Sequence, residues 1–326
     1  MKSDALQLIK APVAADLERF NELFRSTLSH DNPLLNAALQ HIVAELGKQM
    51  RPTLTLLSAR LLGEVNQNVL DVALSLELLH TATLLHDDVV DESNQRRGLA
   101  SLNASFGNKV AVLVGDFVLS KALQHATFTK NITVFATLSE LGQTLSDGEL
   151  LELSNAGQGI MDEASYFEVN RRKTASLFSA CAQLGALMGG ATDEEAERMH
   201  HFGQLVGMSF QLRDDVFDLT ASDEVGKPVG KDMREGKVTL PTLYAIHHSQ
   251  DDEMTAIAAR VRAREATDAE IETLMRFTIE NGGLDYARWQ MDQFRMMAAG
   301  LIQEHRNADA AQALRTYMDY VIDRDI

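Results

Sequence analysis

The sequence predicts an all-α protein in which many helices pack into one domain that covers residues 1–326. Only five prolines occur, so the stretch between Pro52 and Pro228 lacks the residue that most strongly interrupts a helix. Within it, apolar residues recur at three- and four-residue spacing among Ala, Leu, Glu, Gln and Met. Neither a low-complexity linker nor a shift of composition marks a second domain, and a chain of 326 residues can bury a core without disulfides.

The helical pattern is clearest over residues 69–90 and 197–219, where two helices are predicted. Loops are predicted where Gly, Asn, Asp and Ser gather, at residues 63–66, 93–98, 155–159, 189–193, 223–228 and 281–283. The chain beyond Pro241 continues the helical pattern without a recognisable motif.

Charge and cysteine content exclude several classes of function. The 30 Lys and Arg against 47 Asp and Glu give a formal charge of −17, which repels nucleic acid. A single cysteine, Cys181, cannot form an internal disulfide and favours a reducing compartment. The N-terminus lacks a signal-peptide pattern, and no uninterrupted apolar run reaches the roughly 20 residues of a membrane span. We therefore expect a cytoplasmic protein.

One short pattern, Asp-Asp-Val-x-Asp, occurs twice. On a helix, residues four apart lie about 40° from each other, so the first and last aspartates of each copy share a face. A solvated acidic surface explains either copy alone, but the duplication on apolar helices favours facing carboxylates inside a bundle. Because all ligands are hard oxygens, Mg²⁺ completed by a phosphorylated substrate is the expected metal. The candidate ligands are Asp87, Asp88, Asp91, Asp214, Asp215 and Asp218.

Basic residues stand close to both aspartate motifs in the sequence. Arginine binds phosphate oxygens bidentately and lysine supplies a point charge, so such a set suits a diphosphate, although any one of them alone is more often a surface charge. The set comprises Lys48, Arg51, Arg96, Arg97, Lys173, Lys227, Lys231 and Lys237.

Taken together, these motifs resemble those of the trans-prenyl diphosphate synthases, and within them the long-chain, octaprenyl-type branch. The resemblance runs from about Gly47 to Pro241. It comprises Gly47–Pro52, His80–Asp91, Arg96–Gly98, Phe106–Asn108, Gly115–Asp116, Lys173–Thr174, Gln211–Asp218, Gly226–Lys227 and Lys237–Pro241. It implies a homodimer that adds isopentenyl diphosphate head-to-tail to an allylic diphosphate, with farnesyl diphosphate as the primer. The product implied is around octaprenyl in length, suited to a quinone side chain and released through a brief membrane contact.

The resemblance also implies a role for each motif residue. Asp87, Asp91 and Asp214 are the expected direct ligands of several Mg²⁺ ions, and Asp88, Asp215 and Asp218 support them. The allylic diphosphate is expected to bind Arg96, Lys173, Lys227 and Lys237. The isopentenyl diphosphate is expected to bind Lys48, Arg51, His80 and Arg97. Thr174 and Gln211 would flank the reacting carbon, and Lys173 and Lys227 would assist it.

Product length is expected to depend on the small side chains of Ala82 and Thr83, where short-chain relatives often have an aromatic ring. Thr83 lies one turn before Asp87 on nearly the same face, so it should line any cavity that leads away from the metals. A deeper floor could come from Phe128 or Phe135, each of which could equally be a plain core residue. His86 is expected to be structural.

Two departures and several alternatives stay open. Many relatives have glutamine where this chain has Glu152, and an apolar residue where it has Arg213, which could pair with a carboxylate or point outward. The alternatives are a shorter-chain, geranylgeranyl-type synthase, a class I terpene cyclase, a non-catalytic subunit of a heteromeric synthase, and a helical binding scaffold. A cyclase binds one diphosphate and would have no use for Lys48, Arg51 and the Arg96–Arg97 pair.

Overall fold

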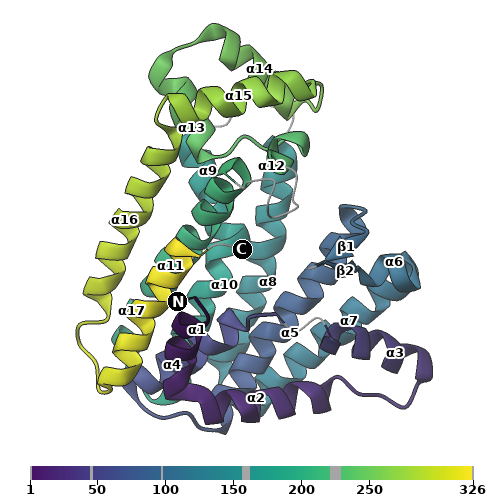
Figure 1. Cartoon of the computed structure of the whole chain (residues 1–326). Coiled ribbons are helices and arrows are strands. Elements are labelled where there is room, and N and C mark those ends of the chain that lie inside the picture. The colour runs from purple at the N-terminus through teal and green to yellow at the C-terminus, as the bar shows by residue number, and fades with distance from the viewer. Residues whose placement is uncertain (1, 45–46, 97, 156–161, 221–228, 325–326) are drawn as a thin grey trace.

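The computed structural model describes residues 2–44, 47–96, 98–155, 162–220 and 229–324. Over these residues the protein is helical apart from loops and one small hairpin, as predicted (Figure 1). The hairpin pairs β1 (Gln95–Arg96) with β2 (Leu99–Ala100) in antiparallel fashion, so the predicted loop at 93–98 contains a short strand.

The first half of the chain forms the helices that carry the first aspartate motif. They are α1 (Lys2–Lys10), the 3₁₀ turn η1 (Ala11–Val13), α2 (Ala14–Thr27), α3 (Pro33–Ala44), α4 (Met50–Leu62), α5 (Gln67–Val90), α6 (Leu102–Phe106), α7 (Asn108–Phe128) and α8 (Ile132–Asn155).

The second half carries the second motif. It comprises α9 (Glu163–Asn170), the π-helical turn η2 (Arg171–Ala175), α10 (Ser176–Gly189), α11 (Asp193–Thr220), α12 (Lys231–Arg234), α13 (Leu240–Ser249), α14 (Asp252–Arg262), α15 (Asp268–Glu280), α16 (Gly283–Leu301) and α17 (Ala308–Asp323). The predicted helices over 69–90 and 197–219 are confirmed as parts of α5 and α11. The predicted breaks at 63–66, 189–193 and 281–283 separate helices, whereas most of 155–159 and all of 223–228 lie outside the described residues.

Close helix contacts bring the two halves together. A Cβ atom on Gly203 would lie 2.3 Å from the carbonyl oxygen of Phe178, so only glycine lets α11 approach α10 this closely. A Cβ atom on Gly185 would lie at the same distance from the Thr55 carbonyl oxygen, so glycine at this position lets α10 pack against α4. Because α5 also packs on α4, α7 and α10, the ends of α5 and α11 become parts of one bundle.

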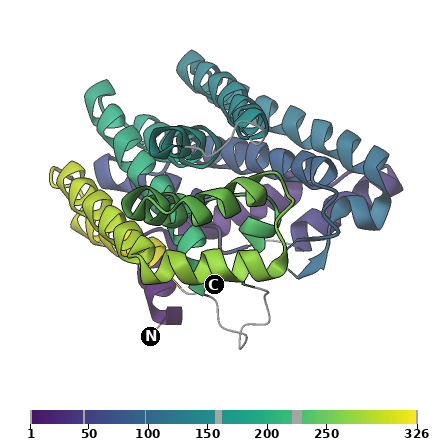
Figure 2. The same ribbon diagram turned by 90° about the horizontal axis from the view of Figure 1, so that it is seen from above.

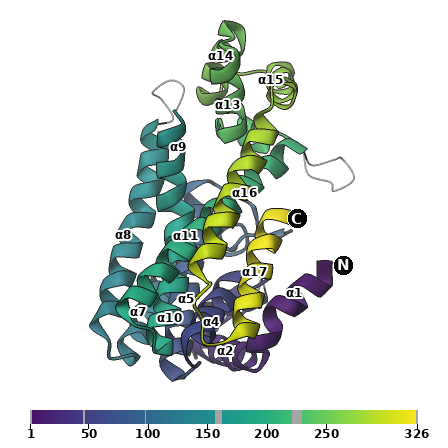
Figure 3. The same cartoon turned by 90° about the vertical axis from the view of Figure 1, so that its left-hand side faces the viewer.

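Helix α5 is long and apolar enough to cross a membrane, but 72% of its most apolar window is buried within the protein. It is therefore the central helix of a core. Helices α13, α14 and α15 lie across one end of the bundle (Figure 2), and α16 runs from them down the outside beside α17 (Figure 3). Helix α17 also packs against α1 and α4, which places the C-terminal end of the described chain near the entrance to α4.

Candidate active site

The first aspartate motif closes α5. Asp91 follows the last residue of the helix and donates its backbone N–H to the Asp87 carbonyl oxygen at 2.8 Å, so both residues keep helical geometry. Asp88 points inward and is 2% exposed. Arg96, on the β1–β2 hairpin, binds both of its carboxylate oxygens, with Nε and Nη2 at 2.8 and 2.7 Å. The middle aspartate is thus neutralised by a guanidinium eight residues away.

The pKa of Asp87 is shifted by its surroundings at this end of the site. Burial and the nearby charges of Glu149 and Asp91 raise the pKa of Asp87 to about 6, although Lys173 and Arg96 act in the opposite direction. Burial therefore disfavours the charged form of this carboxylate, and a bound cation would relieve that cost.

The second motif lies in the last turns of α11, and its three carboxylates have different partners. Asp214 forms an ion pair with Arg324, whose guanidinium carbon also lies 3.7 Å from the centre of the Phe210 ring. Asp215 is 1% exposed; it accepts hydrogen bonds from the Tyr166 hydroxyl and from Gln211 Nε2, the latter at 3.0 Å. Burial raises the pKa of Asp215 to about 8, although both donors oppose the shift.

Asp218 and Asp232 form a further acidic pair beside the second motif. Asp218 accepts the backbone N–H groups of Lys231 and Asp232 at 3.0 and 3.2 Å and so fixes the start of α12. Burial raises the pKa of both carboxyls, that of Asp232 to about 6 with a contribution from Asp218. Asp232 was not among the predicted site residues, because it belongs to no repeated pattern.

Lys173 contacts two carboxylates of α8, Glu149 and Glu152. It lies on the π-helical turn η2, where its Nζ is 2.8 Å from a Glu149 oxygen and 2.5 Å from a Glu152 oxygen. Despite burial, which opposes the shift, these two carboxylates raise the pKa of Lys173 above its usual value. Glu152 likewise raises the pKa of Lys237, which pairs with Glu235 at 3.0 Å. Glu152 thus contacts Lys173 and also acts on the charge of Lys237.

A separate basic cluster forms between α4, α11 and the C-terminal residues. The Arg51 guanidinium carbon lies 4.8 Å from the centre of the Phe178 ring and 6.0 Å from that of Phe210, the ring that Arg324 also covers. Lys48 is exposed, with Nζ 5.8 Å from the centre of the Tyr320 ring on α17. His80 is partly buried on α5.

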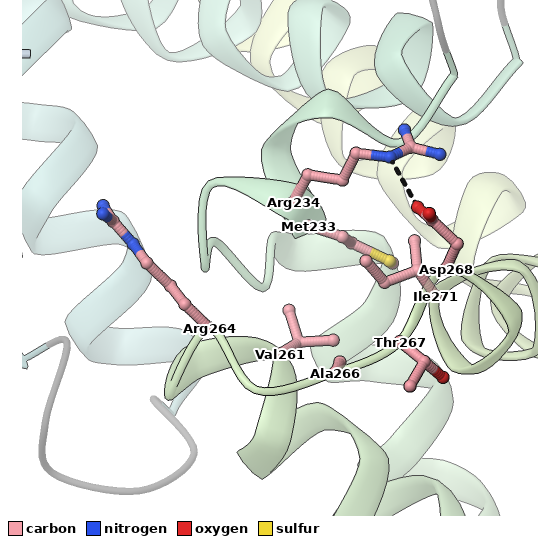
Figure 4. A pocket seen from close by; sticks show the side chains of 8 residues that line it. All are labelled: Met233, Arg234, Val261, Arg264, Ala266, Thr267, Asp268 and Ile271. Carbon is pink, nitrogen blue, oxygen red and sulfur yellow. Dashed lines mark hydrogen bonds and ion pairs between the residues drawn. The ribbon is translucent and has the colours of Figure 1, made fainter. Parts of the chain in front are cut away.

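Within the part of the chain that the structure describes, no three carboxylate, imidazole or thiol groups gather closely enough to form a ready-made metal cluster. The best-formed cavity, of about 400 Å³, lies between α12, α14 and α15. Its arginine Arg234 is tied to Asp268, with Nε and Oδ1 3.1 Å apart, and the Arg264 side chain points away from its apolar lining (Figure 4). It contains none of the predicted site residues.

Comparison with known proteins matches this arrangement to one family. Residues 32–278 fit the family model of the polyprenyl synthetases. The chain belongs to this family. It is 35% identical to octaprenyl diphosphate synthase of Escherichia coli strain K12 over 98% of this chain and 99% of that protein. The decaprenyl diphosphate synthase structure from Rhodobacter capsulatus covers 98% of both chains with 33% identity and a TM-score of 0.91.

A geranylgeranyl pyrophosphate synthase structure from Bacteroides thetaiotaomicron is also similar, with 43% identity, a TM-score of 0.86, and 98% of this chain and 100% of that chain covered. The resemblance deduced from the motifs is therefore confirmed, and the protein is a prenyltransferase with the all-α fold of that family.

In this polyprenyl synthetase, the structure settles two residues that the sequence left open. Arg213 does not point freely outward: its Nε donates to the Arg324 carbonyl oxygen at 2.8 Å and holds this part of the chain in place. Glu152 contacts Lys173 and raises the pKa of Lys237. Arg97 and Lys227 lie outside the described residues.

The residues expected to control product length differ in how deeply they are buried. Ala82 is 1% exposed and packs in the core, whereas Thr83 is partly buried and donates its hydroxyl to the His80 carbonyl oxygen at 2.8 Å. Phe128 and Phe135 are 50% and 39% exposed in the single chain, so neither is a plain core residue there, and a role as a deeper floor stays a prediction. His86 fits between α5 and α7, where a Cβ on Gly115 would lie 2.3 Å from its Nε2.

Sequence reasoning missed the contribution of α17 and α9 to the site. Arg324, Tyr320 and Tyr166 reach motif residues only through tertiary contacts, and none of them stands in a pattern of spacing. The helical period predicts that α17 packs on a core, but it does not predict that this core lies beside Arg51.

Proposed function

We propose that this polyprenyl synthetase adds isopentenyl diphosphate head-to-tail to an allylic diphosphate, with farnesyl diphosphate as primer and a long all-trans product of around octaprenyl length. The positions of Lys173 and Thr174 carry the proposal. Lys173 acts on the pKa of Asp87 in the first motif, and its neighbour Thr174 bonds Gln211, which donates to Asp215 in the second. The similarity to octaprenyl and decaprenyl diphosphate synthases supports a long product.

The donor set suits Mg²⁺. Asp87 and Asp91 from α5 and Asp214 from α11 offer hard carboxylate oxygens, and the raised pKa of Asp87 reflects a buried charge that a cation would stabilise. Mg²⁺ binds through one or two carboxylates and completes its shell with water and substrate phosphates, so a ready-made cluster of three ligands is not required. Bound magnesium would supply positive charge to the departing diphosphate.

The chain's own residues perform the remaining steps. Lys173 and Lys237, with Arg96 and Lys227, hold the allylic diphosphate and stabilise the charge that develops as its C–O bond breaks. The oxygens of Thr174 and Gln211, 3.1 Å apart, are proposed to stabilise the allylic carbocation, and the apolar helices to exclude water that would capture it. The double bond of isopentenyl diphosphate attacks the cation, and the released diphosphate accepts the proton that is lost.

The basic cluster of Lys48 and Arg51, with His80 and Arg97, is proposed to bind isopentenyl diphosphate. Arg51 lies against Phe178 and Phe210 instead of in solvent, so its guanidinium keeps a fixed position for a phosphate group. Arg324 adds a further cation at this site from the other end of the chain. This second cluster favours a synthase over a terpene cyclase, which needs one diphosphate site.

The protein is further proposed to act as a cytoplasmic homodimer that meets a membrane briefly when its product leaves. Large apolar side chains lie exposed along the adjoining helices α7 and α8, a surface that a second copy would cover. They are Val112, Leu113, Leu123, Phe128, Ile132 and Phe135.

The decisive experiment incubates the purified protein with Mg²⁺, farnesyl diphosphate and labelled isopentenyl diphosphate, and separates the dephosphorylated products by chromatography. We expect Mg²⁺-dependent chains of about six to ten isoprene units, the range that the family resemblance implies. A single four-unit product would support the geranylgeranyl alternative, a cyclic hydrocarbon would support a cyclase, and no turnover would support a non-catalytic subunit or scaffold.

A further inference from the structure

A row of hydrogen bonds leads from a buried tyrosine to the proposed carbocation site. Tyr166 on α9 is 4% exposed and donates its hydroxyl to Asp215 Oδ2. Gln211 Nε2 donates to the other carboxylate oxygen, Oδ1, at 3.0 Å, and Thr174 Oγ1 donates to Gln211 Oε1 at 3.1 Å. Three elements, α9, α11 and η2, thus meet in one chain of donors and acceptors.

The chemistry of these groups fixes the direction of every bond in the row. Because Tyr166 occupies Oδ2, Oδ1 remains an acceptor whether Asp215 is ionised or carries its proton on the tyrosine side. The Gln211 amide must then turn its NH₂ group to Asp215 and its oxygen to Thr174. Thr174 has one hydroxyl proton and gives it to that oxygen, so its own lone pairs face away from Gln211.

The middle aspartates of the two motifs therefore differ in function from their neighbours. Both oxygens of Asp215 are engaged by protein donors inside the core, whereas Asp87 and Asp214 are only partly buried. A carboxylate in that position is suited to orient Gln211, one turn earlier on α11, and less suited to bind a metal directly.

We propose that Tyr166 is a positioning residue of the condensation: by holding Asp215, it orients Gln211 so that Thr174 presents oxygen lone pairs, and not a proton, to the allylic carbocation. The inference rests on the proposed function. The proton of Thr174 would otherwise be free to point at the cation, which would disfavour ionisation.

The test begins with Tyr166→Phe, which removes the hydroxyl and keeps the ring. Loss of such an outer partner is expected to lower kcat about 10- to 100-fold, with the KM of both diphosphates changed less than about threefold. The matched control is Tyr286→Phe, because the Tyr286 hydroxyl donates to Glu163 at 2.6 Å outside this row. The control should keep wild-type kcat. A Tyr166→Phe enzyme with wild-type kcat, or with changes in KM alone, would overturn the proposal.

A double-mutant cycle separates positioning from a general structural effect. Thr174→Val removes the hydroxyl on which Tyr166 is proposed to act, so adding Tyr166→Phe should lower kcat by less than about threefold further. Thr174→Ser, which keeps the hydroxyl, should retain the sensitivity to Tyr166→Phe. Additive losses in the Thr174→Val cycle would contradict the inference.

Asp215→Asn provides an independent arm should Tyr166→Phe fold poorly. Its amide can donate to Gln211 and allow the reverse orientation, so kcat should fall at least as far, again without additivity to Thr174→Val. The two proposals fail separately: a wild-type protein that forms no prenyl product contradicts the proposed function, whereas an active wild type with additive cycles contradicts this inference alone.

Discussion

The two aspartate motifs have nearly the same sequence but different surroundings. In the first, the middle residue Asp88 is neutralised by Arg96, which stands eight residues later on the adjoining hairpin. In the second, the middle residue Asp215 has uncharged donors, Tyr166 and Gln211, while a cation pairs with the outer residue Asp214 instead. A shared spacing therefore places carboxylates alike but does not assign them the same task.

The helices also differ one turn before each motif. Thr83 precedes the first motif, and Phe210 stands at the same distance before the second. Phe210 packs beneath the Arg51 and Arg324 guanidiniums, whereas Thr83 has a small side chain without a ring. The contrast suggests that α5 provides the path of the growing tail and α11 the support of the isopentenyl site.

The largest expected effect is shared by both motifs. Asp87→Ala and Asp214→Ala should each lower kcat by more than about 10²-fold, because each removes a proposed metal ligand that the other carboxylates cannot replace. Steady-state assays with Mg²⁺ measure the loss, and circular dichroism checks the fold. Asp285→Ala, an exposed aspartate on α16, is the matched control and should remain active. Undiminished turnover in both motif variants would contradict the metal assignment.

The sequence predicted the helices of this site better than its contacts. Period and proline spacing place Asp87 and Asp91 on one face of a helix, since this depends on local geometry alone. The partners of the second motif cannot be predicted this way: Tyr166, Arg324 and Asp232 come from α9, the chain end and α12. Their positions follow from how helices pack, which a single sequence does not specify.

The second prediction separates the motifs by stability. Arg96→Ala leaves Asp88 buried without its guanidinium, which should lower the free energy of unfolding by about 3 kcal/mol. Arg324→Ala releases Asp214, whose side chain is 38% exposed, so the loss should be about 1 kcal/mol. Urea unfolding of the metal-free protein measures both. Equal losses would show that the different burial of the two ion pairs has no energetic consequence.

The third prediction sharpens the contrast between Thr83 and Phe210. A ring on α5 one turn before Asp87 should block the growing tail, so Thr83→Tyr should shorten the product from about six to ten isoprene units to roughly three to five. Each buried methylene favours elongation by about 0.8 kcal/mol, so a steric block, and not a lack of driving force, must end it. Chromatography of the products measures the change.

Ala82→Phe also tests whether α5 lines the growing tail, at a position that is more closely packed than Thr83. Ala82 is fully enclosed in the core, so a ring there must displace its neighbours, at a cost of about 1–3 kcal/mol in stability. We expect shorter products again, with a lower melting temperature than Thr83→Tyr. Active variants with the wild-type product length would show that α5 does not line the tail.

The smallest expected effect concerns pH and again distinguishes the motifs. Asp87 must be ionised to bind Mg²⁺, yet its pKa is raised to about 6 by burial and by Glu149. At limiting Mg²⁺, kcat/KM should therefore fall as the pH drops through about 6, because protons compete with the metal for this carboxylate. Saturating Mg²⁺ favours the ionised form and should move the midpoint to lower pH, by up to about one unit per tenfold rise in Mg²⁺.

The stability of the metal-free protein should show the opposite trend: a raised carboxyl pKa contributes stability below about pH 4 that is lost as the pH rises through 6. Asp87→Asn should reduce the loss between pH 4 and 6, while Asp232, whose pKa is also raised to about 6, continues to contribute to it. An acidic limb that stays fixed as Mg²⁺ is varied would mean that Asp87 does not bind the metal.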